Sequence, residues 1–273
     1  MTIYALGKIE MGSKSIQHTA KFKFKYSFCS LVTDVSEYHE MVASAKKAGF
    51  DEGAEFLFID NSIKNEFDGF SGYNRFLMEA QGEFIIFCHQ DILFEFDDRQ
   101  ALEKRIDEMT HMHPKWAILG NAGKSRTGHS IVRITDPGAT NLRQGAFPTQ
   151  VMSVDENLMI IKREANIACS SQLSGFHLYA TDLCQNAEYL GYECFVIDFH
   201  LRHKSAGNPN QSYFAVQDQL KSLYKYRKRT QIIQAMCSRF LVSSSFILML
   251  LGNQKWLLNL HKSLSKKIDK SGL

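Results

Sequence analysis

The 273-residue sequence lacks the glycine patterns that mark several common nucleotide-binding and hydrolytic folds. No G-x-G-x-x-G follows its first apolar run, and neither G-x-x-x-x-G-K-[ST] nor G-x-S-x-G occurs anywhere. In those folds the glycines let the backbone wrap a phosphate or hold a nucleophilic serine on a sharp turn. Their absence argues against a dinucleotide-binding Rossmann enzyme, a P-loop NTPase and an α/β-hydrolase.

Paired cysteines and a secretory leader are also missing. No two cysteines have C-x-x-C spacing, and several lie within apolar runs. We therefore expect buried free thiols in a reducing compartment rather than disulfides or a zinc site. The N-terminus has no continuous apolar stretch of the signal-peptide kind, so we expect a cytoplasmic protein. The six cysteines are Cys29, Cys88, Cys169, Cys184, Cys194 and Cys237.

The sequence has little excess charge of either sign. The net charge is +3, which is too mild to indicate a nucleic-acid partner. Basic residues gather locally, in KFKFK at 21–25, KYRKR at 225–229 and four lysines after residue 261. Each cluster is either a solvated face or a contact for an anionic partner.

What the first 120 residues do contain is an alternation of apolar strands and amphipathic helices. The strands are expected at 26–32, 55–59, 84–88 and 116–122. The helices are expected after an N-cap at Ser36, over 70–80 and around 102–109. Continuous apolar strands separated by helices indicate a sheet covered on both faces. We predict an α/β fold with a mostly parallel central sheet flanked by helices.

The pattern changes after residue 122. Residues 123–150 are rich in Gly, Thr, Ser, Arg and Asn and predict a long loop or an irregular insertion. A strand pair or one long strand is expected at 151–163, then a helix and a strand within 176–198. A polar loop at 199–210 and a helix over 213–224 follow. Residues 1–20 show no periodicity and predict an irregular arm.

Three apolar strands run directly into polar side chains, at Thr33-Asp34, Asp60-Asn61 and His89-Gln90-Asp91. Because parallel sheets bind ligands beyond the carboxyl ends of their strands, we expect these groups on one ligand-binding edge. A carboxylate at that edge suits a hard divalent cation. Asp91 is equally suited to capping the next turn.

Asp182 and His203, later in the sequence, are also candidate site residues. Asp182 lies beside the apolar stripe of a predicted helix, where Asp is disfavoured, so it is either solvated or placed at a cleft. His203 follows a strand, and its i,i+3 spacing from His200 does not put both rings on one face of a strand or loop. We therefore predict no zinc site from that pair.

Several segments, taken in order, resemble the successive motifs of family 2-type glycosyltransferases with the GT-A fold, in a bacterial branch whose D-x-D reads H-Q-D. These segments are SLVTD, FLFIDNS, YNRFLMEAQGEFIIFCHQDILF and GFHLYATDLCQNAEYLGYECFVIDFHLRHKSAG, which fall within about residues 26–210. The resemblance implies a GT-A domain over 21–230, with a nucleotide-sugar half at 21–122 and an acceptor half at 123–230. It implies hexosyltransferase-like, inverting transfer from a nucleotide-diphospho-sugar to a glycan or lipid-linked acceptor, with Mg²⁺ or Mn²⁺ as cofactor.

The same resemblance implies roles for residues of the donor site. Thr33 and Asp60, with Asn61 beside it, match positions that contact the nucleobase and ribose. Asn74 matches an asparagine on the helix before the D-x-D strand. His89 stands where the first acid of D-x-D is expected, and this puts its contact with the ribose or the metal in question.

It also implies roles for the metal and acceptor sites. Asp91 matches the last aspartate of D-x-D, which holds the metal on the diphosphate, and His203 matches a histidine that completes this site. Asp182 matches the catalytic base. Asp155-Glu156 replaces a D-G pair that relatives often show.

The C-terminal segment, 231–273, predicts a helical extension. Residues 240–254 carry no charge, but serines and a glycine interrupt them, and they fall short of the ~20 apolar residues of a membrane span. The segment either docks on the protein's own core or lies in the membrane interface. The second arrangement suits acceptors at the cytoplasmic face of the membrane, as in bacterial surface polysaccharide synthesis.

Two other functions remain open from the sequence. A nucleotidyltransferase would want a basic, glycine-rich loop after the first strand, which VTDVSEYHE does not supply. A non-catalytic nucleotide- or carbohydrate-binding protein is consistent with the replaced acid at His89.

Overall fold

The computed structural model describes residues 22–205, 211–227, 230–234 and 239–260. The predicted N-terminal arm and residues 261–273 of the predicted C-terminal segment lie outside the described residues, as does Cys237. The chain forms two compact units, the first ending at Gln217 and the second beginning at Asp218.

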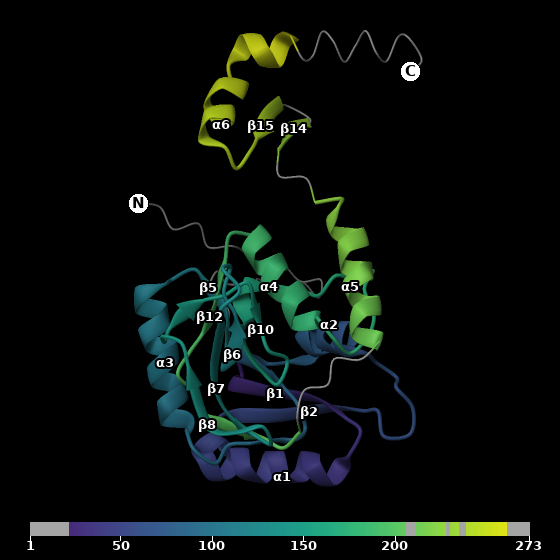
Figure 1. Ribbon diagram of the computed structural model, residues 1–273, viewed down its shortest axis with the longest axis vertical. Coiled ribbons are helices and arrows are strands. Elements are labelled where there is room, and N and C mark those ends of the chain that lie inside the picture. Colours follow the sequence, from purple (N-terminus) through teal and green to yellow (C-terminus); the bar gives the residue numbers. More distant parts are fainter. Residues whose placement is uncertain (1–21, 206–210, 228–229, 235–238, 261–273) are drawn as a thin grey trace, which may run out of the picture. The chain divides into compact units, whose positions relative to one another are not determined.

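The first unit is built on a seven-stranded sheet in the order β2-β1-β3-β11-β5-β12-β9. Figure 1 labels β1, β2, β5 and β12 of this sheet. β1 pairs in parallel with β2 and β3, and β12 pairs in parallel with β5, whereas β11 and β9 run antiparallel to their neighbours. The predicted α/β fold with a mostly parallel central sheet is therefore confirmed. The strands are β1 Phe24–Val32, β2 Ala54–Asp60, β3 Gly82–Cys88, β5 Trp116–Gly120, β9 Thr149–Gln150, β11 Leu158–Lys162 and β12 Glu193–Val196.

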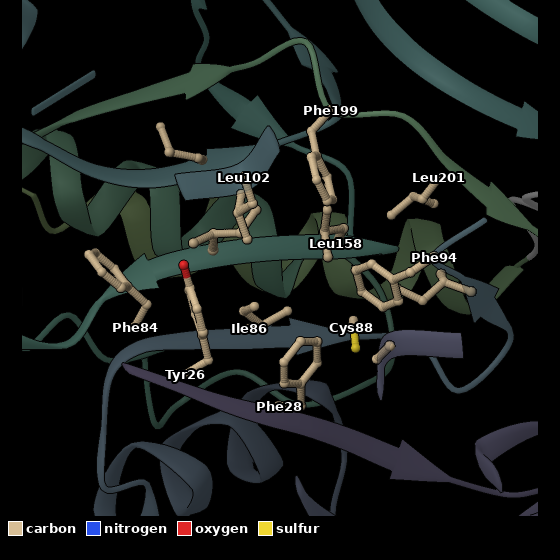
Figure 2. Close-up of a cluster of buried hydrophobic side chains, with 14 of the residues drawn as sticks. Tyr26, Phe28, Phe84, Ile86, Cys88, Phe94, Leu102, Leu158, Phe199 and Leu201 are labelled. Atoms are coloured by element: carbon tan, nitrogen blue, oxygen red, sulfur yellow. The ribbon is translucent and has the colours of Figure 1, made fainter. Parts of the chain in front are cut away.

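Helices cover both faces of this sheet, which explains why its inner strands β3, β11 and β5 are almost entirely apolar. On one face, β1, β3 and β11 share a core with α1 and α3, and Figure 2 shows Phe28, Ile86 and Leu158 in this cluster. On the other face, Phe87 of β3 packs against Tyr73 of α2 and Tyr179 of α4, at ring-centroid distances of 5.7 and 5.5 Å. The helices are α1 Val35–Ala45, α2 Gly69–Glu79, α3 Arg99–Met112 and α4 Tyr179–Tyr189, with a π turn at Lys46–Phe50 and a 3₁₀ turn at Arg163–Ala165.

Aspartates begin the first three helices. Asp34 accepts hydrogen bonds from the N–H groups of Ser36 and Glu37, so the predicted N-cap at Ser36 is wrong by two residues. Asp68 and Asp98 cap α2 and α3 in the same way. Such side chains satisfy N–H groups that the first helical turn leaves unpaired.

A second sheet corrects the expected loops at 123–150 and 199–210. Its order is β10-β6-β7-β13-β4, and β8 pairs with β7. Ile131, Ile134 and Thr135 of β7 are buried and its other residues are half-buried, so the strand has no strict alternation that the sequence could reveal. The strands are β4 Ile92–Leu93, β6 Ala122–Lys124, β7 Ser130–Asp136, β8 Ala139–Gln144, β10 Ser153–Val154 and β13 Leu201–His203.

The C-terminal residues form a β-hairpin as well as helices. α5 Gln211–Tyr224 is followed by the hairpin of β14 Gln231–Gln234 and β15 Arg239–Val242, and then by α6 Phe246–Gly252. Part of the predicted helical extension is therefore a β-hairpin. Among the described residues, no helix has both the length and the apolar character needed to cross a membrane. The five described cysteines are buried and free, as predicted.

Candidate metal centre and sugar-nucleotide site

Polar residues at the ends of β1, β2 and β3 gather at one edge of the central sheet, as predicted. Val32 of β1 lies opposite Asp60 of β2, and Cys29 lies opposite Phe87 of β3. The residues that follow these strands therefore leave the sheet together. This edge is where sheets of this kind bind ligands.

The second sheet brings His203 to Asp91. β13 pairs with β4 so that His203 lies opposite Ile92, the residue after Asp91. The Lys204 N–H donates to the Asp91 carbonyl at 3.0 Å and extends this pairing. Two residues far apart in the chain are thus fixed by backbone register rather than by flexible side chains.

His89, Asp91 and His203 form a cluster whose ligand atoms all lie within 4.8 Å of one another. His203 Nε2 is 3.3 Å from Asp91 Oδ1 and 3.3 Å from His89 Nδ1, and His89 Nδ1 is 4.0 Å from Asp91 Oδ1. Ligand atoms ~2.1 Å from a shared ion lie roughly 3.0 to 3.5 Å apart in octahedral or tetrahedral arrangements. The cluster therefore fits a divalent cation with only small adjustments.

Electrostatics within the cluster favour the carboxylate. Burial would raise the pKa of Asp91, but hydrogen bonds from His203 and Ser205 lower it overall. Burial would lower the pKa of His203, but the hydrogen bond and charge of Asp91 raise it overall. Burial and the charge of His203 both lower the pKa of His89. An anionic Asp91 and a neutral His89 suit metal binding, whereas His203, whose pKa is raised, would have to release its proton to hold an ion.

The turn between β10 and β11 forms a wall beside His89. The Asn157 carbonyl accepts the His89 N–H at 3.1 Å, and the Asp155 Oδ1 accepts both the N–H and the side-chain amide of Asn157. The Asn157 Oδ1 is buried and has no hydrogen-bond partner among the described residues. From the other side, the Tyr179 hydroxyl lies 3.3 Å from His89 Nε2.

Gln90 was expected at the ligand edge but without a role of its own, and the structure gives it one. Its side-chain oxygen accepts the N–H groups of Thr33 and Asp34 at 2.7 and 3.0 Å, and its amide donates to the Thr33 hydroxyl at 3.1 Å. Gln90 thus fixes the loop after β1 to the loop after β3. In the sequence, only its position between the candidate ligands His89 and Asp91 indicated a role at the site.

The predicted nucleotide-sugar residues divide into two groups. Thr33 and Asp60 are exposed at the strand ends. Asn61 instead holds the following loop, because its side chain bonds to the backbone of Glu66 and Phe67. Asn74 forms a two-way amide pair with the backbone of Cys169 at 3.0 and 2.8 Å, which ties α2 to the loop after β11.

Asp182 is not exposed at the site. It is 0% exposed, and its two oxygens accept the N–H and the hydroxyl of Ser170 at 2.6 and 2.9 Å. The Asn186 amide donates to the same carboxylate at 3.2 Å. Asp182 therefore anchors the segment that leads into α4. The structure does not place it at a cleft.

Glu156 lies close to the start of α4, which has no side-chain cap. The residue at the N-cap is Leu178, which has φ of 63° and no side-chain acceptor. Burial and the charge of Asp155 raise the pKa of Glu156 to about 8, although the backbone of Leu178, Ala180 and Tyr179 lowers it in part. The turn before β11 therefore lies close to the N-terminus of α4.

No family model matches the sequence. A search for related proteins finds the "ATP synthase subunits region ORF 6" protein of Fuscovulum blasticum, which is 32% identical over 219 residues. The match covers 77% of this chain and 87% of that protein. The chain belongs to the same family as this protein. The name of this relative states no activity, so membership of the family leaves the function to be argued from the site.

Solved structures similar to the chain include two transferases and a protein named TarS. The mannosyltransferase PcManGT of Pyrobaculum calidifontis, in complex with GDP-Man and Mn²⁺, has 10% identity and a TM-score of 0.49, over 77% of this chain and 69% of its own. GalNAc-T7, with UDP, GalNAc and Mn²⁺, has 11% identity and a TM-score of 0.46, over 70% of this chain and 45% of its own. TarS of S. aureus has 12% identity and a TM-score of 0.44, over 67% of this chain and 37% of its own. Likeness at this level assigns no residue a role.

Proposed function

We propose that the chain is a glycosyltransferase that uses a divalent metal and a nucleotide-diphospho-sugar donor. The observation that carries this proposal is the His89, Asp91 and His203 cluster at the carboxyl edge of β1 to β3. The order of the sequence motifs, which resembles family 2-type glycosyltransferases, supports the same activity. The acceptor is proposed to be the hydroxyl of a glycan or a lipid-linked sugar.

The residues of the cluster would hold the ion by one carboxylate oxygen and two imidazole nitrogens. A bound ion would act as a Lewis acid that stabilises the negative charge on the departing diphosphate. Imidazole ligands suit Mn²⁺ better than Mg²⁺, which prefers a shell of oxygens. We therefore propose Mn²⁺ as the more effective of the two predicted cofactors.

The donor nucleotide is proposed to lie along the ends of β1 and β2, with Thr33 and Asp60 at its base and ribose. Gln90 would orient Thr33 through the hydrogen bonds described above. Asn61 and Asn74 would act through the loops that they hold rather than by touching the donor.

The proposed general base is Asp155 rather than Asp182. Asp155 is exposed, and its charge acts on both His89 and His203, so it lies near the proposed diphosphate site. Asp182 could accept a proton only if the Ser170 segment moved away from it. In-line attack by a hydroxyl that has lost its proton to Asp155 would invert the anomeric centre.

The test is nucleotide-sugar hydrolysis in the absence of acceptor. The purified chain is incubated with UDP- and GDP-sugars and with Mn²⁺ or Mg²⁺, and the release of nucleoside diphosphate is measured. We expect release that Mn²⁺ stimulates and that Asp91→Asn lowers by about 100-fold, the usual effect of removing transition-state charge stabilisation. Asp107→Asn, an exposed aspartate on α3, is the matched control.

Two results would contradict the proposal. Thermal stabilisation by a nucleotide-sugar without any release, even with acceptor glycans present, would identify a binding protein. Equal rates of release for the Asp91→Asn and Asp107→Asn variants would show that Asp91 does not hold the metal. The proposed setting of the enzyme is the cytoplasm, with surface polysaccharide synthesis as its pathway class.

A further inference from the structure

The second unit exposes an unusually apolar surface. Phe246 at the start of α6 is 79% exposed, Ile247 is 66% exposed and Trp256 is 65% exposed. None of the residues of α6 is buried. We call this the C-terminal apolar surface; it comprises Phe240, Val242, Phe246, Ile247, Leu248, Met249, Leu250, Leu251, Trp256 and Leu260. Apolar surface of this extent on a soluble protein usually marks a binding site for a protein or a membrane.

Hydrogen bonds tie the elements of this surface together. The Asn253 side chain accepts the Leu241 N–H and donates to the Leu241 carbonyl, both at 2.9 Å, and so ties the end of α6 to β15. Ser245 caps α6 through the Leu248 N–H. These hydrogen bonds therefore fix the backbone of the unit, while its apolar side chains remain exposed.

The charge of the segment indicates what covers the surface. Residues 225–273 contain ten Lys and Arg residues and one acid, so their net charge is +9 in a chain whose total is only +3. Arg239 and Lys255 flank a stretch, 240–254, that has no charge at all. An apolar centre between cations matches the interface of an anionic bilayer, where Trp side chains also prefer to lie.

A second copy of the chain would be a poorer occupant, because two segments of net charge +9 repel each other. Insertion across the bilayer does not fit either. α6 has seven residues and a length of about 10 Å, against the ~30 Å of a hydrocarbon core. A helix this short with apolar side chains all round can enter only the outer part of one leaflet.

We propose that the C-terminal apolar surface docks the protein onto an anionic lipid bilayer without spanning it. Phe246, Leu250 and Trp256 enter the interface, and Lys255 contacts the lipid phosphates. The proposal goes beyond the transferase activity and stands independently of it. It would place the chain where lipid-linked acceptors are found.

Vesicle binding by the full-length protein tests this docking. Co-sedimentation is measured with vesicles of phosphatidylcholine alone and of phosphatidylcholine mixed with an equal part of phosphatidylglycerol. We expect at least about tenfold tighter binding to the anionic vesicles, weakened by salt. Leu250→Glu should abolish binding, whereas Ile63→Glu, at a position 98% exposed in the first unit, should leave it unchanged.

Tryptophan fluorescence gives a second readout. The chain has two tryptophans, and Trp116 is fully buried, so a blue shift on adding anionic vesicles would report Trp256. Trp256→Phe should remove the shift. These exposed positions can change without loss of the fold, which circular dichroism checks.

Three outcomes would overturn the proposal. One is equal binding to neutral and anionic vesicles. Another is a concentration-dependent dimer that Leu250→Glu dissociates while no vesicle binding is seen. The third is a lower melting temperature of the first unit in Leu250→Glu, which would show that the surface packs on the protein's own core.

Discussion

At the scale of single residues, two carboxylates compete for the general-base role. Asp182→Asn should mainly lower the melting temperature, because an amide cannot accept both hydrogen bonds of Ser170 without loss. Asp155→Asn should lower transfer by about 10² to 10⁴-fold, the usual contribution of a general base, with nucleotide-sugar binding retained. Transfer assays and donor titrations of both variants measure the difference. Full transfer by Asp155→Asn, with loss in a folded Asp182→Asn, would restore Asp182 as the base.

The sequence was informative about residues whose position depends on local structure. Asp91 follows a buried strand, and that alone placed it at the ligand edge. Asp182 lies beside an apolar stripe, which does not distinguish a cleft from a buried anchor, since its partner Ser170 comes from a loop of no regular pattern. The role of Gln90 depends on backbone N–H groups more than fifty residues away, which no spacing rule reveals.

At the scale of elements, we expect the stability of the contact between α4 and the turn before β11 to depend on pH. Because the pKa of Glu156 is raised from 4.5 to about 8, the folded state binds more protons than the unfolded state between these values. Stability should therefore fall as the pH rises from about 5 to about 8. Glu156→Gln should not show this loss, so its melting temperature should gain on the wild type across that range. Melting curves at several pH values measure this gap.

The control for this pH effect is Glu164→Gln, at an exposed carboxylate just after β11. Its melting curves are measured over the same pH range as a reference for replacing a glutamate elsewhere in the first unit. A constant offset between Glu156→Gln and the wild type would show that Glu156 has no raised pKa.

Helices and strands whose apolar residues recur at a regular spacing were predictable from the sequence. Strands that are stabilised by pairing with distant segments were not. β1, β3 and α1 carry apolar residues whose spacing matches the face that they bury. β7 and β13 have only a few buried side chains each, and their pairing joins residues 67 positions apart in the chain. β4 is two residues long and exists because β13 lies beside it. Such strands follow from tertiary pairing, which a linear pattern does not contain.

At the scale of the whole molecule, the metal cluster joins parts of the chain that are 114 residues apart. His89 directly follows β3, while His203 is the last residue of β13 in the second sheet. An ion held by both would connect the two sheets of the first unit and would have no equivalent site in the unfolded chain. Metal binding should therefore stabilise the fold by mass action.

At Mn²⁺ concentrations about 100-fold above its dissociation constant, this stabilisation should be about 2.7 kcal/mol. For a unit of this size the melting temperature should rise by roughly 5 to 10 °C. His203→Ala should remove most of the rise, whereas His111→Ala, at an exposed histidine of α3, should keep it. Differential scanning fluorimetry with Mn²⁺, Mg²⁺ and chelator measures these shifts. A smaller effect of Mg²⁺ follows from the two imidazole ligands, and an equal rise with Mg²⁺, or with His203 replaced, would mean that the ion binds elsewhere.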